Sequence, residues 1–251
     1  MRTKTLKLLF IFTILSFVFG CASDEKNADT PEGAFKIAKE YEDAERFEVA
    51  IQKYSDVKNK FPYSSYATAA ELAIADVQYK RESYPEAQIA YQNFRDLHPK
   101  HQKIAYVVFR TGMSYYLQLP VTIDRDLSLA TDAIYSFNEL IKSYPNSEFY
   151  KEAKEKREQA YIMLTEKELY IADFYFKQKK YDSALIRYEN AYKKYSGFGL
   201  DPRSLFGAIR SAQKLNDSAK QKAYSNLLLS KFASSDEAQK LKKLGRNEEV
   251  E

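Results

Sequence analysis

Four segments of this chain repeat one spacing of small, aromatic and apolar residues. Each has an alanine, an aromatic residue four positions later, and a small or apolar residue three positions after that. In chain order the triplets are Ala50, Tyr54 and Val57; Ala87, Tyr91 and Phe94; Ala133, Phe137 and Leu140; and Ala184, Tyr188 and Ala191. Because residues at these spacings share one face of an α-helix, each segment is expected to form a helix with a buried side.

The first three of these segments end in proline, at Pro62, Pro99 and Pro145, whereas the fourth has Ser196 at that position. Proline stops a helix, the alanine allows a partner helix to approach closely, and the aromatic residue fills the space one turn later. This combination is typical of the second helix of a tetratricopeptide repeat. The sequence therefore predicts an all-α fold, a tetratricopeptide-repeat superhelix of about five helical hairpins.

The distances between the repeated alanines are irregular, and the extra residues indicate insertions. Pro120 and the polar residues around it predict a loop within Leu117 to Ala130. The stretch from Glu148 to Lys180 contains no Gly or Pro, which predicts one long central helix with three hairpins before it and two after it. The fifth hairpin is expected between Asp201 and Leu244.

The N-terminus has the layout of a secretory signal peptide. Basic residues precede an apolar run from Leu8 to Phe19, which is too short to span a bilayer, and Gly20 and Cys21 follow it. Cys21 is the only cysteine, and its context resembles a bacterial lipobox, so it is predicted to be lipidated and to anchor the mature chain to a membrane. Ordinary secretion with a free thiol is the alternative.

These features divide the chain into five predicted segments. They are a signal peptide at 1–20, a lipidated N-terminus and flexible tether at 21–30, N-terminal repeats 1–3 at 31–146, the long helix with C-terminal repeats 4–5 at 147–244, and a disordered tail at 245–251. The chain has 39 Lys and Arg against 35 Asp and Glu, and three of the basic residues belong to the signal peptide. The mature chain is therefore close to neutral, which gives no basis for nucleic-acid binding.

No residue pattern supports catalysis, a cofactor or a metal. His98 and His101 are the only histidines, and Pro99 between them marks a turn with no Cys or clear carboxylate partner for a metal. Gly197 and Gly199 lack the preceding strand and the Lys-Ser/Thr pair of a phosphate-binding loop. We therefore expect no catalytic, cofactor or metal residues.

Several segments resemble the BamD family, the lipoproteins of the outer-membrane β-barrel assembly (Bam) machinery. The resemblance covers essentially all of the mature chain and rests on Cys21, on the irregular repeats, and on the segments His98 to Tyr116, Ile123 to Asp126 and Ser143 to Ala153. It implies a non-enzymatic scaffold that is lipid-anchored at the periplasmic face of the cell outer membrane.

The resemblance also implies partners and binding residues. The implied partners are a BamA-like barrel protein held through a periplasmic POTRA domain, unfolded outer-membrane proteins with a C-terminal β-signal, and other Bam lipoproteins. Arg187 matches an arginine linked in the family to BamA contact, and Phe61 and Tyr175 match residues associated with substrate engagement. Hairpin packing for Phe61 and Tyr175, and a solvated helix surface for Arg187, are the alternatives.

A different function is also compatible with a lipid anchor and helical repeats. The chain could be another tetratricopeptide-repeat lipoprotein of the envelope, such as a pilotin for secretin assembly or an adaptor for peptidoglycan enzymes. The long helix, the number of hairpins and the segment Ser143 to Ala153 favour barrel assembly.

Overall fold

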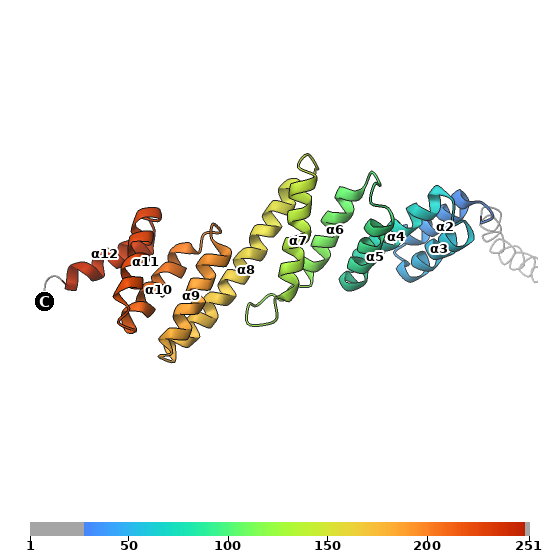
Figure 1. Ribbon diagram of the computed structural model, residues 1–251. Coiled ribbons are helices and arrows are strands. Elements are labelled where there is room, and N and C mark those ends of the chain that lie inside the picture. Colours follow the sequence, from blue (N-terminus) through green and yellow to red (C-terminus); the bar gives the residue numbers. More distant parts are fainter. Residues whose placement is uncertain (1–27, 249–251) are drawn as a thin grey trace, which may run out of the picture. The chain divides into compact units, whose positions relative to one another are not determined.

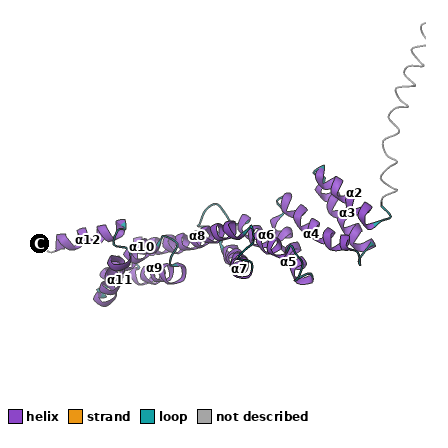
Figure 2. Ribbon diagram, turned by 90° about the horizontal axis from the view of Figure 1, so that it is seen from above, coloured by secondary structure: helices purple, strands orange, loops and turns teal. Residues whose placement is uncertain are grey.

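The computed structural model describes residues 28–248, which form eleven α-helices and no strand (Figure 2). These helices belong to two compact units that divide between His101 and Gln102. The predicted all-α fold of tetratricopeptide-type hairpins is confirmed. The predicted signal peptide and Cys21 lie outside the described residues.

The first unit contains two helical hairpins (Figure 1). Its helices are α2 (Pro31–Asp43), α3 (Phe47–Lys60), α4 (Ser65–Lys80) and α5 (Tyr84–Leu97). Two of them begin at side-chain caps, because Thr30 Oγ1 accepts a hydrogen bond from the Gly33 N–H and Ser64 Oγ accepts one from the Ala67 N–H, each at 3.1 Å. Thr30 and Ser64 thus determine where α2 and α4 start.

The second unit contains three hairpins and a final helix (Figure 1). Its helices are α6 (Ile104–Leu117), α7 (Ser128–Ser143), α8 (Tyr150–Lys177), α9 (Tyr181–Tyr195), α10 (Asp201–Lys214), α11 (Ser218–Lys231) and α12 (Asp236–Glu248). The predicted loop around Pro120 is confirmed, since it connects α6 to α7.

The repeated triplets form the cores of the hairpins, as their spacing predicts. All twelve side chains are buried on the second helices α3, α5, α7 and α9. The first three of these helices end two residues before the repeated proline. The residue before each proline has left the helical conformation, with φ near −130° at Phe61, His98 and Tyr144.

Three of the buried aromatic residues also carry a polar link across their hairpin. The Tyr54 hydroxyl donates to Glu42 Oε2 at 2.6 Å, and the Tyr91 hydroxyl donates to Asp76 Oδ1 at 2.6 Å. Tyr188 donates to Asp173 in the same way. Each link satisfies a hydroxyl that the hairpin core would otherwise leave unpaired.

Helix α8 has a different place from the one predicted for the long helix. It is not a bridge between complete hairpins, because it forms the first helix of the fourth hairpin with α9. Its N-terminal half packs on the third hairpin through Ala160, and its C-terminal half packs on α9 through Leu169 and Ala172. One helix can do both because its 28 residues are uninterrupted by Gly or Pro.

Two predicted segment boundaries can be located on these helices. The boundary at residues 146 and 147 lies in the connection between α7 and α8, where the third hairpin ends. Both helices belong to one compact unit, in which Arg157 Nη1 donates to Asn138 Oδ1 at 2.9 Å. The tail predicted to start at Gly245 is helical as far as Glu248. A single glycine costs a helix only about 1 kcal/mol, so Gly245 does not end α12.

Candidate functional site

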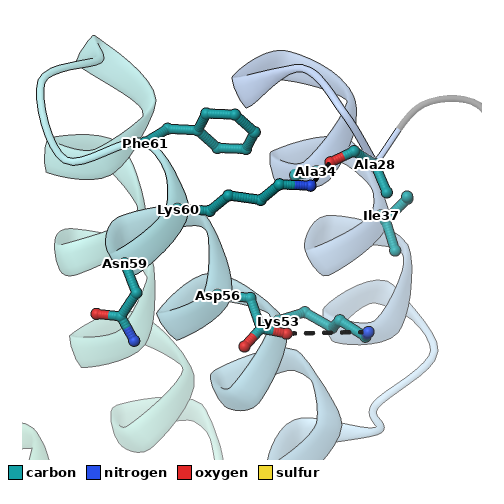
Figure 3. Close-up of a pocket in the computed structure, with 8 residues that line it drawn as sticks. All are labelled: Ala28, Ala34, Ile37, Lys53, Asp56, Asn59, Lys60 and Phe61. Carbon is teal, nitrogen blue, oxygen red and sulfur yellow. Dashed lines mark hydrogen bonds and ion pairs between the residues drawn. The ribbon is translucent and has the colours of Figure 1, made fainter.

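Phe61 lies at the end of α3, where Pro62 forces the chain out of the helix. Its half-buried ring lines a groove of about 510 Å³ (Figure 3). The groove is lined by Ala34 and Ile37 of α2, by Ala28, and by Lys53, Asp56, Asn59, Lys60 and Phe61 of the second helix and its cap. Apolar groups from two helices and polar groups from one helix therefore meet in the first unit.

The cationic side of this groove is formed by two lysines. Lys60 Nζ lies 5.5 Å from the centroid of the Phe61 ring and donates to the Ala28 carbonyl at 3.3 Å (Figure 3). It also pairs with Asp29 at 3.2 Å, and Lys53 pairs with Asp56 at 3.9 Å. Because both ion pairs are largely exposed, they contribute little to stability and can exchange for an incoming anion.

Arg187 lies on α9 in the fourth hairpin and is held by Glu168 of α8. Its Nη1 donates to the two carboxylate oxygens of Glu168 at 3.2 and 3.3 Å. The Arg187 side chain is 39% exposed and the Glu168 side chain 16%. The pair thus fixes an arginine on the hairpin surface with a large part of its side chain open to solvent.

Tyr175 lies two turns beyond Glu168 on the same side of α8. It is half-buried and packs against the hairpin core that contains Leu169 and Ala172. Its ring also meets the Phe174 ring edge-on, with centroids 5.7 Å apart. These contacts agree with hairpin packing, and a role of Tyr175 in substrate binding stays a prediction.

The structure therefore places Tyr175 and Arg187 on one hairpin of the second unit and Phe61 in the first unit. Their binding roles stay predictions. The sequence analysis did not identify Lys60. It also did not identify the tyrosine–carboxylate hydrogen bonds, although two of them share a spacing that is visible in the sequence. Asp76 precedes Tyr91, and Asp173 precedes Tyr188, by the same fifteen residues.

The histidine pair serves local packing. His98 Nε2 lies 2.6 Å from Glu71 Oε2, and the rings of His98 and His101 both contact Phe94, with centroids 4.8 and 5.1 Å away. In the part of the chain that the structure describes, no three His, Cys, Asp or Glu side chains gather as metal ligands. In the same part, no helix combines the length and apolar character needed to cross a bilayer.

Comparison with known proteins places this arrangement among envelope lipoproteins. Residues 27–227 match the family model described as "YfiO: Outer membrane lipoprotein". The chain is 24% identical over 212 residues to "Outer membrane protein assembly factor BamD" of Vibrio cholerae, covering 80% of this chain and 88% of that protein. It is 25% identical over 231 residues to the protein of the same name from Rickettsia prowazekii, covering 90% and 91%.

Among solved structures, the chain is similar to the one described as "TPR2AB-domain:pHSP90-complex of yeast Sti1". The TM-score is 0.41 and the identity 14%, over 83% of this chain and 80% of that one. A likeness this low carries no conclusion about function.

Proposed function

Because the chain belongs to the YfiO family of outer membrane lipoproteins, we propose that it is a non-enzymatic assembly factor for outer-membrane proteins. The family match over residues 27–227 carries this proposal, and the BamD relatives align with most of the chain and most of their own length. In the proposal, acylated Cys21 anchors the protein at the periplasmic face of the outer membrane. The helical repeats then act as a scaffold.

The proposed partner of the fourth hairpin is a BamA-like barrel protein, which binds through a periplasmic POTRA domain. Arg187 supports this role because Glu168 holds it in place while part of its side chain stays exposed. An arginine fixed in this way loses little side-chain entropy when it pairs with a carboxylate on a partner. Other Bam lipoproteins are further proposed partners.

The proposed ligand of the groove at Phe61 is the C-terminal β-signal of an unfolded outer-membrane protein. Such a signal ends in an aromatic residue and a free carboxylate. The groove offers Phe61 and Ile37 for the ring and Lys53 and Lys60 for the carboxylate. Tyr175 is the proposed second substrate contact, on the fourth hairpin.

Affinity capture of the membrane-anchored protein tests the function as a whole. We expect capture to recover a BamA-like barrel protein with POTRA domains. Recovery of a secretin or a peptidoglycan enzyme, without any such barrel, would overturn the proposal in favour of another envelope lipoprotein.

Two variants of the Arg187–Glu168 pair separate partner binding from hairpin stability. Both Arg187→Glu and Glu168→Gln remove the ion pair, but only the first removes the arginine. We expect Arg187→Glu to lose the barrel protein in capture. Glu168→Gln, which keeps the arginine but removes the carboxylate that holds it, should retain most of it, with helicity unchanged in both. Equal capture by the two variants would show that Arg187 is not a partner contact.

A further inference from the structure

The second unit has one edge on which large apolar side chains stand exposed at the turns. Consecutive antiparallel helices place the α6–α7 loop and the α8–α9 and α10–α11 turns at the same edge (lower edge in Figure 1). Val121 in the loop is fully exposed, Leu117 is 39% exposed and Leu215 is 40% exposed. Phe174, in the last turn of α8, is 54% exposed.

The opposite edge of the same unit provides an internal comparison. It carries the α7–α8, α9–α10 and α11–α12 connections, which span residues 144–149, 196–200 and 232–235. None of the exposed large apolar residues of the described chain lies in these connections. Within the second unit, apolar exposure at the turns is thus a property of one edge.

The α8–α9 turn adds positive charge to this edge. Lys177, Lys179 and Lys180 are all exposed, and none of them has an ion-pair partner within residues 28–248. Lys179 takes a left-handed conformation, with φ of 59°, which closes the turn tightly and keeps the three lysines together. Asp182 is the nearest acidic residue in sequence, so the turn has a net positive charge.

In the α6–α7 loop, the carboxylate of Asp126 is engaged locally. Asp126 accepts hydrogen bonds from the Ser128 N–H at 3.1 Å and from the Ser128 hydroxyl at 2.7 Å. Lys167 of α8 donates to the Arg125 carbonyl and so brings a further cation to the base of the loop.

We propose that this edge of the second unit, formed by Leu117, Val121, Phe174 and Leu215 with Lys177, Lys179 and Lys180, contacts the surface of an anionic lipid bilayer. Exposed aliphatic and aromatic tips next to lysines suit the interfacial layer, where the apolar groups enter and the ammonium groups meet lipid phosphates. The apolar residues stand on separate turns instead of lining one groove, which suits a flat surface better than a peptide. The family's location at the outer membrane supplies such a surface.

The inference goes beyond the assembly function, and site-specific probes in a purified system test it. The full chain is reconstituted into vesicles of phosphatidylethanolamine and phosphatidylglycerol, with an environment-sensitive fluorophore on Val121→Cys or Phe174→Cys. Tyr135→Cys on α7 is the matched control, since Tyr135 is 71% exposed but lies away from the edge. The parent chain, treated with the same fluorophore, is the control for labelling of Cys21.

We expect the probes at positions 121 and 174 to shift to shorter emission wavelength and to be quenched by spin-labelled lipid, and the probe at position 135 to remain in water. Replacement of Lys177, Lys179 and Lys180 by Gln should weaken the contact roughly a hundred-fold, since each lysine near an anionic surface contributes about 1 kcal/mol. Replacement of Lys240, Lys242 and Lys243 on α12 by Gln should leave it unchanged.

Water-like emission at positions 121 and 174, or equal signals in anionic vesicles and in phosphatidylcholine vesicles, would overturn the inference. An equal effect of the two lysine replacements would overturn it as well. None of these results depends on a protein partner, so a failure here is separable from a failure of the affinity capture.

Discussion

The ring of Tyr188 on α9 occupies the space that a side chain at Gly207 on α10 would need. A Cβ added to Gly207 would lie 2.3 Å from Cε1 of Tyr188, well inside van der Waals contact. The Tyr188 ring of the fourth hairpin therefore lies directly against the backbone of the fifth hairpin. Within the third hairpin, the Phe137 ring lies against Gly112 in the same way, 2.7 Å from the position of an added Cβ. Glycine at these positions is a packing requirement.

We expect Gly207→Ala to destabilise the protein, although alanine favours a helix by about 1 kcal/mol over glycine. Overpacking against Tyr188 costs about 1–3 kcal/mol and outweighs that gain. Urea denaturation followed by circular dichroism measures the difference, with Lys214→Ala on the same helix as the control. A midpoint at or above that of the parent chain would show that Tyr188 moves aside freely.

Tyr54→Phe should lower the free energy of unfolding by about 1–3 kcal/mol, because the Glu42 carboxylate is 6% exposed and loses a hydrogen bond from the tyrosine hydroxyl. The same denaturation measurement applies, and Tyr63→Phe at a fully exposed side chain is the control. Equal midpoints for the two variants would mean that Lys80, which also pairs with Glu42, suffices to satisfy that carboxylate.

Alkaline pH should destabilise the fold. Burial, together with a hydrogen bond to a carboxylate, raises the pKa of Tyr54, Tyr188 and Tyr224 above the ordinary value of 10.0. As the pH rises, the unfolded chain therefore releases these protons before the folded chain does. The contribution of these tyrosines to the free energy of unfolding is thus fully present below pH 10.0 and is lost as the pH rises further. Urea titrations below and above that pH measure the slope, which Tyr54→Phe should reduce and Tyr63→Phe should not change.

Asp201 organises the loop between α9 and α10, and its replacement should loosen that loop. Its buried carboxylate accepts from the Ser196 hydroxyl at 2.5 Å and from the Gly197 N–H at 2.8 Å. The amide in Asp201→Asn has only one oxygen, so it cannot replace both carboxylate oxygens as acceptors. We expect the free energy of unfolding to fall by about 1–3 kcal/mol and hydrogen exchange at residues 196–199 to become faster. Exchange rates equal to those of Asp182→Asn, at an exposed carboxylate, would contradict this.

The groove at Phe61 should bind a peptide that ends in phenylalanine better when its carboxylate is free than when it is amidated. Lys60→Gln should weaken binding of the free acid up to about five-fold, in line with an exposed ion pair, and should not affect the amide. Phe61→Ala should weaken binding of both peptides, since it removes the ring contact. Fluorescence anisotropy measures the affinities, and Lys58→Gln, which lies outside this groove, is the control.

The repeated triplets were sufficient to predict the helices and their buried faces, because packing and helix propensity agree at Ala50, Tyr54 and Val57 and at their equivalents. They did not predict that α8 belongs to the fourth hairpin, since the absence of Gly and Pro says that a helix is long but not what it packs against. The groove at Phe61 was equally out of reach, because it depends on Ala34 and Ile37 of a separate helix.

The candidate residues divide in the same way. The position of Phe61 before Pro62 is a local property, and sequence suffices for it. The pairing of Arg187 with Glu168 joins residues nineteen positions apart and depends on the register of α8 against α9. Residue spacing within one helix cannot predict that register.

The length of α8 has a mechanical consequence. At about 1.5 Å per residue its 28 residues extend about 42 Å without a break, and its two halves are embedded in different hairpins. Because Glu168 joins Arg187 to the C-terminal half of α8, a partner that displaces Arg187 is expected to move α8 and, through its N-terminal half, the third hairpin as well.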